Sequence, residues 1–169
     1  VFDTSKALGI SGDEAATLFG TLMQTANLSA DQAEKLAEGA FQLARQAGVA
    51  PSAVMKDIAG SAEEIAAWTK DGGSNIADAA VQARQMGISL STTAKIASGL
   101  LDFESSIAGE VEASVLIGRQ LNFQKARELA LSGDIAGATK DIVKQLGSEA
   151  DFNALNLIQR ESLAKSIGV

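Results

Sequence analysis

The chain has 169 residues and a formal net charge of −7, with 14 Lys and Arg against 21 Asp and Glu. This acidic balance argues against non-specific nucleic-acid binding, which depends on Lys and Arg neutralising phosphates. The chain has no Cys and no His. Disulfides, thiolate catalysis, the usual zinc sites and serine triads are therefore excluded. No apolar run approaches the roughly 20 residues that span a bilayer.

Helix start and stop signals dominate the chain, and no alternating β-branched run predicts a strand. Pro51 suits the first position of a helix. Three residue pairs fit a capping box: Ser11 with Glu14, Ser29 with Gln32, and Ser61 with Glu64. We expect a short helix before Gly9 and further helices at 12–26, 30–47, 51–59, 62–70, 75–86, 91–120, 123–132, 134–146, 150–155 and 157–167. The fold class is therefore all-α, a multi-helix array or bundle of short helices around one long helix.

A helix end followed by Gly and an apolar residue recurs at Gly9, Gly48, Gly87 and Gly168. The first two intervals are 48−9 = 39 and 87−48 = 39 residues, and the third is 168−87 = 81. Each Gly suits the left-handed conformation that ends a helix, as do those at 60 and 147. The spacing is consistent with degenerate helical-hairpin repeats of about 39 residues, although such helix ends are common and the period could be accidental. Residues 1–169 are expected to form a single helical region with a possible hinge at 71–74, where two glycines adjoin.

The segment 91–120 is the longest run without a turn signal, and we expect one buried helix there. Apolar residues line one side of it, and a second stripe that includes Val115 lies beside them. Two stripes require cover from neighbouring helices or from another subunit. The residues expected to make packing or subunit contacts are Ile96, Leu100, Phe103, Ile107, Val111 and Leu116. If Phe103 is in the core, truncation to Ala should cost about 3–5 kcal/mol.

Nothing in the chain has the composition of a catalytic or metal site, and we expect no enzyme activity, cofactor or metal. The close carboxylate pairs are Glu63 with Glu64 and Glu110 with Glu112, but residues one or two apart on a helix point in different directions. The acidic side of the long helix is expected to be solvated. The basic residues Arg119, Lys125 and Arg127 are expected to form a solvated turn.

From Gln85 onward the chain resembles a segment of tail tape-measure proteins of tailed bacteriophages. The resemblance lies in Gly87-Ile-Ser-Leu-Ser-Thr, Leu101-Asp-Phe-Glu-Ser-Ser-Ile107, Glu112-Ala-Ser-Val-Leu-Ile-Gly-Arg-Gln-Leu121, Lys125-Ala-Arg-Glu-Leu-Ala-Leu131 and Asn156-Leu-Ile-Gln-Arg-Glu-Ser-Leu-Ala164. The first half is similar to the same family through Val54-Met-Lys-Asp-Ile-Ala59 and Ala80-Val-Gln-Ala-Arg84.

This resemblance implies a non-enzymatic structural protein of the virion, located in the tail lumen or at the tail tip. It implies roles in tail assembly, length determination and genome ejection, with further copies of the chain, tail-tube proteins and tail-tip or baseplate proteins as partners. The chain does not begin with Met, and we expect it to be processed or part of a longer polypeptide. Two alternatives stay open: a helical-repeat module that binds proteins, and a lytic region of a tape-measure chain.

Overall fold

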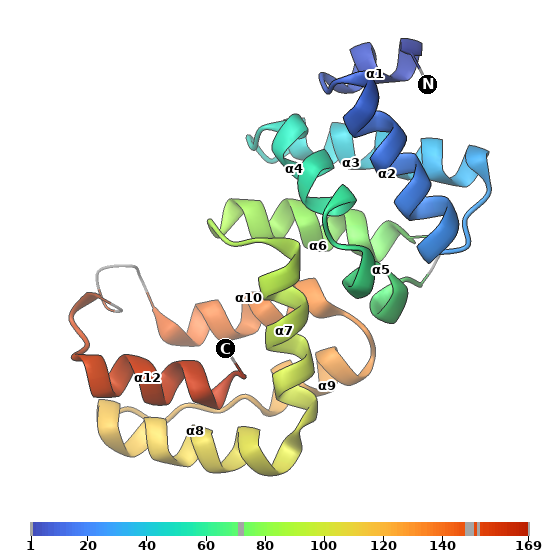
Figure 1. Ribbon diagram of the computed structural model, residues 1–169. Helices are drawn as coiled ribbons and strands as arrows, with labels where there is room; N and C mark the ends of the chain where they lie inside the picture. Colours follow the sequence, from blue (N-terminus) through green and yellow to red (C-terminus); the bar gives the residue numbers. More distant parts are fainter. Residues whose placement is uncertain (1, 71–72, 148–150, 152, 169) are drawn as a thin grey trace. The chain divides into compact units, whose positions relative to one another are not determined.

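The computed structural model describes residues 2–70, 73–147, 151 and 153–168, and its fold is all-α (Figure 1). The chain divides into two compact units, residues 1–91 and 92–169. Unit 1 contains the helices α1 (Phe2–Leu8), α2 (Gly12–Thr25), α3 (Ala30–Gln46), α4 (Pro51–Ala59), α5 (Ala62–Trp68), α6 (Ser74–Gln85) and the first residues of α7 (Leu90–Leu101). Unit 2 contains the rest of α7 and the helices α8 (Phe103–Ile117), α9 (Gln124–Leu131), α10 (Ile135–Leu146) and α12 (Leu157–Ser166).

The helix boundaries agree closely with those predicted, except within the segment 91–120. The continuous helix predicted there is wrong, because α7 ends at Leu101 and α8 begins at Phe103. Asp102 separates them with φ −78° and ψ 78°, and its side chain accepts a hydrogen bond from the Ser105 amide (3.4 Å). A carboxylate that accepts from the first turn of a helix stabilises a helix start at that point. The expected hinge at 71–74 and helix at 150–155 include residues that lie outside the described ones.

In unit 1, α3 packs against α4 and α6, and α2 packs against α4. Alanine supplies much of this core, and the alanines that α3 buries are Ala33, Ala37, Ala40 and Ala44. Small side chains let helix backbones approach closely, so each contact buries little apolar area and many contacts share the stabilisation.

The predicted glycine stops are confirmed where Gly9, Gly48 and Gly87 end α1, α3 and α6, with φ of +68°, +73° and +75°. After each glycine the next amide reaches back five residues to a helix carbonyl. These bonds are Ile10 to Ser5 (3.1 Å), Val49 to Ala44 (3.0 Å) and Ile88 to Ala83 (2.9 Å). This pattern satisfies carbonyls that the helix end leaves free. A repeating structural unit behind the pattern stays a prediction. The left-handed stop expected at Gly60 is wrong, because its φ is −84°.

Two of the three predicted capping boxes are confirmed, at Ser11 with Glu14 and at Ser29 with Gln32. The box expected at Ser61 with Glu64 is wrong. The Ser61 hydroxyl donates to the Asp57 carbonyl of the preceding helix (2.7 Å), and Glu64 accepts from the Ser91 hydroxyl (2.6 Å). A competing partner therefore takes each of the two side chains.

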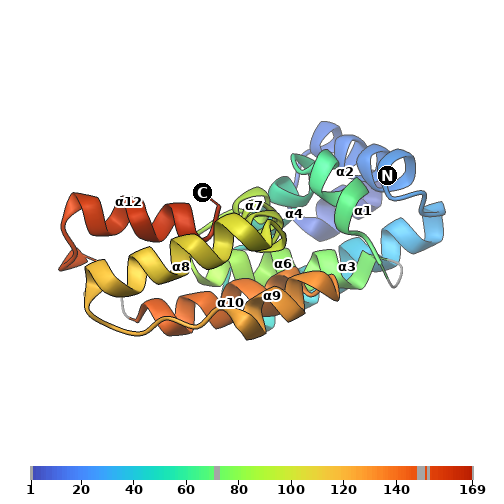
Figure 2. The ribbon, with the colours of Figure 1, turned by 90° about the horizontal axis from the view of Figure 1, so that it is seen from below.

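In unit 2, α8 packs along α12 and α9 packs against α10, and Figures 1 and 2 both show α8 and α12 side by side. Gly109 lies where α8 approaches α12 closely, since a Cβ added there would lie 2.7 Å from the Ser166 Cα. The residues of α8 that are fully buried are all small, namely Ser106, Gly109 and Ala113. The large apolar residues of α8 therefore lie elsewhere on the helix.

Candidate interaction surface

Helix α8 exposes large apolar side chains on the side that α12 does not cover. Phe103, Ile107, Val111 and Val115 are 46%, 49%, 59% and 76% exposed. Residues four apart are neighbours on a helix surface, so these four side chains form one continuous ridge, called here the outer face. An ordinary surface helix buries its large apolar residues and exposes polar ones. Helix α8 does the reverse, because its smallest residues occupy the buried side.

The outer face continues onto α9 through Leu131, which is also exposed. A hollow of about 360 Å³ lies between the two helices in unit 2. The residues that line it are Phe103, Ile107, Gln124, Arg127, Glu128 and Leu131. Most of its wall is apolar, and its size suits a large side chain from another molecule.

A buried ion pair beneath this surface ties α8 to α9. The Arg127 guanidinium donates to the Ser106 hydroxyl (2.9 Å) and to Glu110 Oε2 (2.7 Å). The Phe123 amide donates to the same carboxylate oxygen (2.9 Å). The side chains of Arg127 and Glu110 are only 9% and 15% exposed. Because Glu110 and Ser106 are held inward, the helix is fixed in the rotation that turns Phe103 and Ile107 outward.

This ion pair differs from the expected arrangement of charges. Arg127 was expected in a solvated basic turn with Arg119 and Lys125, and Glu110 on a solvated acidic side. Arg119 instead donates to the carbonyls of Gln145 and Leu146 at the end of α10 (2.8 and 2.9 Å). Arg119 and Lys125 are both exposed, and only Arg127 is buried. These partners lie 17 to 27 residues apart in the chain, so helical spacing gave no indication of them.

The charges that border the outer face are acidic. Helix α8 contains three Glu and no Lys or Arg, and Glu110 is already paired internally. Glu104 lies three residues before Ile107 on the same exposed side, and Glu128 lines the hollow. Glu112 is exposed and lies 3.9 Å from Lys165, an exposed pair of small energetic value. The surface is therefore an apolar ridge with a negative border.

The six predicted contact residues divide into two groups. Ile96 and Leu100 are buried on α7, whereas Phe103, Ile107, Val111 and Leu116 are exposed on α8. Phe103 is therefore not a core residue, and the 3–5 kcal/mol cost of its truncation does not apply. Contact of these residues with another subunit stays a prediction. Val115 belongs to the second apolar stripe predicted from the sequence, through its i+4 spacing from Val111, but it is not among the six predicted contact residues. Leu131 is in neither set.

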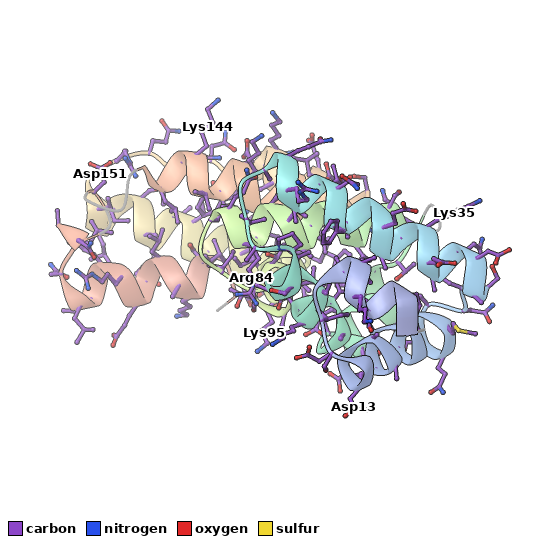
Figure 3. All side chains as sticks on the ribbon, turned by 90° about the horizontal axis from the view of Figure 1, so that it is seen from above. Asp13, Lys35, Arg84, Lys95, Lys144 and Asp151 are labelled. Carbon is purple, nitrogen blue, oxygen red and sulfur yellow. The ribbon has the colours of Figure 1, made fainter. Side chains whose placement is uncertain are left out.

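The buried carboxylate of Asp57 in unit 1 is the side chain that most resembles a catalytic group. It accepts a hydrogen bond from the Leu90 amide (2.8 Å), and Arg84 lies 3.5 Å away; Figure 3 labels Arg84. Burial raises the pKa of Asp57, while the Leu90 amide and the Arg84 charge oppose that rise and the negative charge of Glu64 adds to it. Its evident task is to accept the first amide of α7.

The carboxylate pairs considered from the sequence do not converge. Glu64 accepts a hydrogen bond from Ser91, and Glu110 is bound to Arg127. Neither carboxylate therefore shares a partner with the other member of its pair, Glu63 or Glu112. Within the described ranges, no group of three or more acidic side chains could hold a metal ion. No helix among those described is long and apolar enough to cross a bilayer.

Comparison of the chain with protein-family models, with curated proteins and with solved structures finds no match.

Proposed function

We propose that the protein is a non-enzymatic structural component that acts through protein–protein contact, and that it is a segment of a phage tail tape-measure protein. The outer face of α8 is the observation that supports a contact role. Large apolar side chains at regular helical spacing stay in water there, and covering them would contribute about 25 cal/mol for each Å². Contiguous apolar surface of this kind is typical of interaction sites.

The resemblance from Gln85 onward supports the assignment to a phage tail. Its phrases Leu101–Ile107 and Lys125–Leu131 contain the apolar residues Phe103, Ile107 and Leu131. The proposed partners are other copies of the chain, tail-tube proteins and tail-tip or baseplate proteins, and the proposed location is the virion. The proposed roles are tail assembly, length determination and genome ejection.

Purified virions test this proposal. An antibody raised against the 169-residue chain should detect, on a denaturing gel of virions, a polypeptide of many hundreds of residues. Introducing Ile107→Asp into the parent gene should reduce the number of complete tails seen by electron microscopy, while Met23→Asp should not. Absence of the chain from virions, or normal tails with Ile107→Asp, would contradict the proposal.

The three equivalent helix ends at Gly9, Gly48 and Gly87 favour a second candidate, a helical-repeat module that binds a peptide. A free-standing monomeric chain that binds a peptide through unit 1, with no virion association, would support this module over the tail component.

A further inference from the structure

We infer that the outer face of α8, together with Leu131, binds an amphipathic helix of a partner protein whose apolar stripe is bordered by Lys and Arg. This inference rests on the contact role proposed above and is independent of the assignment to a phage tail. It specifies the chemistry of the partner, which the exposed apolar ridge alone does not.

The shape of the surface suits a helix. From Phe103 to Val115 the ridge runs along α8 for twelve helical steps, or about 18 Å at the helical rise. The apolar anchors of a helix recur at i, i+3, i+4 and i+7, which matches a straight ridge of this length. The hollow between Phe103, Ile107 and Leu131 lies at one end of the ridge. One large apolar anchor of the partner would be seated there, with smaller ones against Val111 and Val115.

The acidic residues beside the ridge favour a partner that carries Lys or Arg. Glu104 and Glu128 lie at the end of the ridge where the hollow is, and Arg127 in the hollow wall is neutralised by Glu110. A Lys or Arg beside the partner's apolar anchor would meet an uncompensated carboxylate. Opposite charges placed across an interface favour the right partner and penalise like-charged ones.

The same charges disfavour two other occupants. A second copy seated on this face would bring another α8, which carries Glu and no basic residue, against the acidic border. The whole chain carries a net charge of −7. An anionic membrane would be repelled for the same reason, since adsorption to anionic lipid depends on Lys and Arg. A basic amphipathic helix complements both the apolar ridge and its negatively charged border.

Two synthetic peptides of about 14 residues test the inference, with one apolar stripe of Leu and Ile and either Lys or Glu along its borders. Binding to the intact chain is measured by fluorescence anisotropy of a labelled peptide. The Lys peptide should bind at least about tenfold more tightly than the Glu peptide, a difference of about 1.4 kcal/mol. Raising the salt concentration should weaken its binding, because screening acts on exposed charges.

Variants separate this site from general attraction to an acidic protein. Ile107→Asn leaves the net charge unchanged and should weaken the Lys peptide about tenfold or more. Met23→Asn is the matched control, since Met23 in unit 1 is 43% exposed against 49% for Ile107, and it should have no effect. Val111→Asn repeats the test, and circular dichroism confirms that each variant folds. Glu104→Lys with Glu128→Lys should reverse the preference toward the Glu peptide.

Several results would overturn the inference. These are failure of both peptides to bind, equal binding of the two, or Lys-peptide binding that Ile107→Asn and Val111→Asn do not change. Self-association seen by sedimentation and abolished by Ile107→Asn would identify a second copy as the occupant, and binding to anionic vesicles would identify a membrane. Peptide binding by a chain that is absent from virions would overturn the phage-tail assignment alone.

Discussion

Replacing Arg127 by Met tests whether the buried ion pair fixes α8 on α9. Met fills a similar volume without charge, so the change removes the bonds to Ser106 and Glu110 and leaves little cavity. Glu110 then keeps one amide donor, Phe123, and stays largely out of water. Breaking a buried pair by removing one partner costs about 3–5 kcal/mol. Because Glu110 retains some solvent contact, we expect the lower end, about 3 kcal/mol.

Urea unfolding followed by far-UV circular dichroism measures this cost. With an m-value of about 2 kcal/mol per M, the midpoint should fall by roughly 1.5 M. Trp68, the single tryptophan of the chain, lies in α5, so its fluorescence follows unit 1 in the same titration. Lys125→Met is the control, because it removes an exposed positive charge from the same helix. It should cost less than about 0.5 kcal/mol.

A second substitution distinguishes an unpaired charge from a loss of packing. Glu110→Gln added to Arg127→Met removes the stranded charge and keeps an oxygen that accepts from the Phe123 amide. The double variant should recover at least about half of the lost stability, because removing both members of a buried pair costs far less than removing one. A cost below about 1 kcal/mol for Arg127→Met, or no recovery in the double variant, would refute the reasoning.

Three further predictions follow from the backbone and from Asp57. Gly48→Ala should destabilise the protein by about 1–2 kcal/mol through its left-handed backbone, whereas Gly39→Ala within α3 should stabilise it by about 0.5–1 kcal/mol. Neither added Cβ meets another atom within 4 Å, so thermal melts that show equal shifts would refute the backbone explanation. Gly109→Ala should destabilise the protein by about 1–3 kcal/mol, because the added Cβ would overpack against Ser166. Gly20→Ala is the control, because a Cβ there meets open space and causes no overpacking. The urea unfolding midpoints of the two variants measure the difference. For Asp57, the pKa in the folded state lies above the ordinary 3.8, so the folded state binds the proton more tightly than the unfolded state does. Protonation of Asp57 therefore adds to the free energy of unfolding. This contribution is complete below pH 3.8 and is lost as the pH rises through the folded pKa. Asp57→Asn should remove that component of the pH dependence, and a carboxyl NMR titration midpoint at or below 3.8 would contradict it.

The all-α class and most helix boundaries were predictable because the signals for them are local. The capping boxes at Ser11 and Ser29 join residues three positions apart, and the glycine stops at Gly48 and Gly87 join residues five positions apart or fewer. Both partners of such a short-range interaction lie within one short stretch of sequence, so the sequence alone indicates the interaction. The local predictions were wrong where a partner distant in the sequence competed. The Ser91 hydroxyl, for example, donates to the Glu64 carboxylate that was expected to cap α5.

The candidate surface was only partly predictable for the same reason. Apolar spacing selected Phe103, Ile107 and Val111 as contact residues, but spacing does not say which neighbour covers a stripe or whether any does.

The sequence by itself therefore determined the all-α class, most of the helix boundaries and the absence of the usual catalytic side chains. The tertiary structure decided which side of α8 is buried. Gly109 permits close approach to Ser166, and Arg127 draws Glu110 and Ser106 inward. Both contacts join residues far apart in the chain, and together they leave the large apolar side chains of α8 in water.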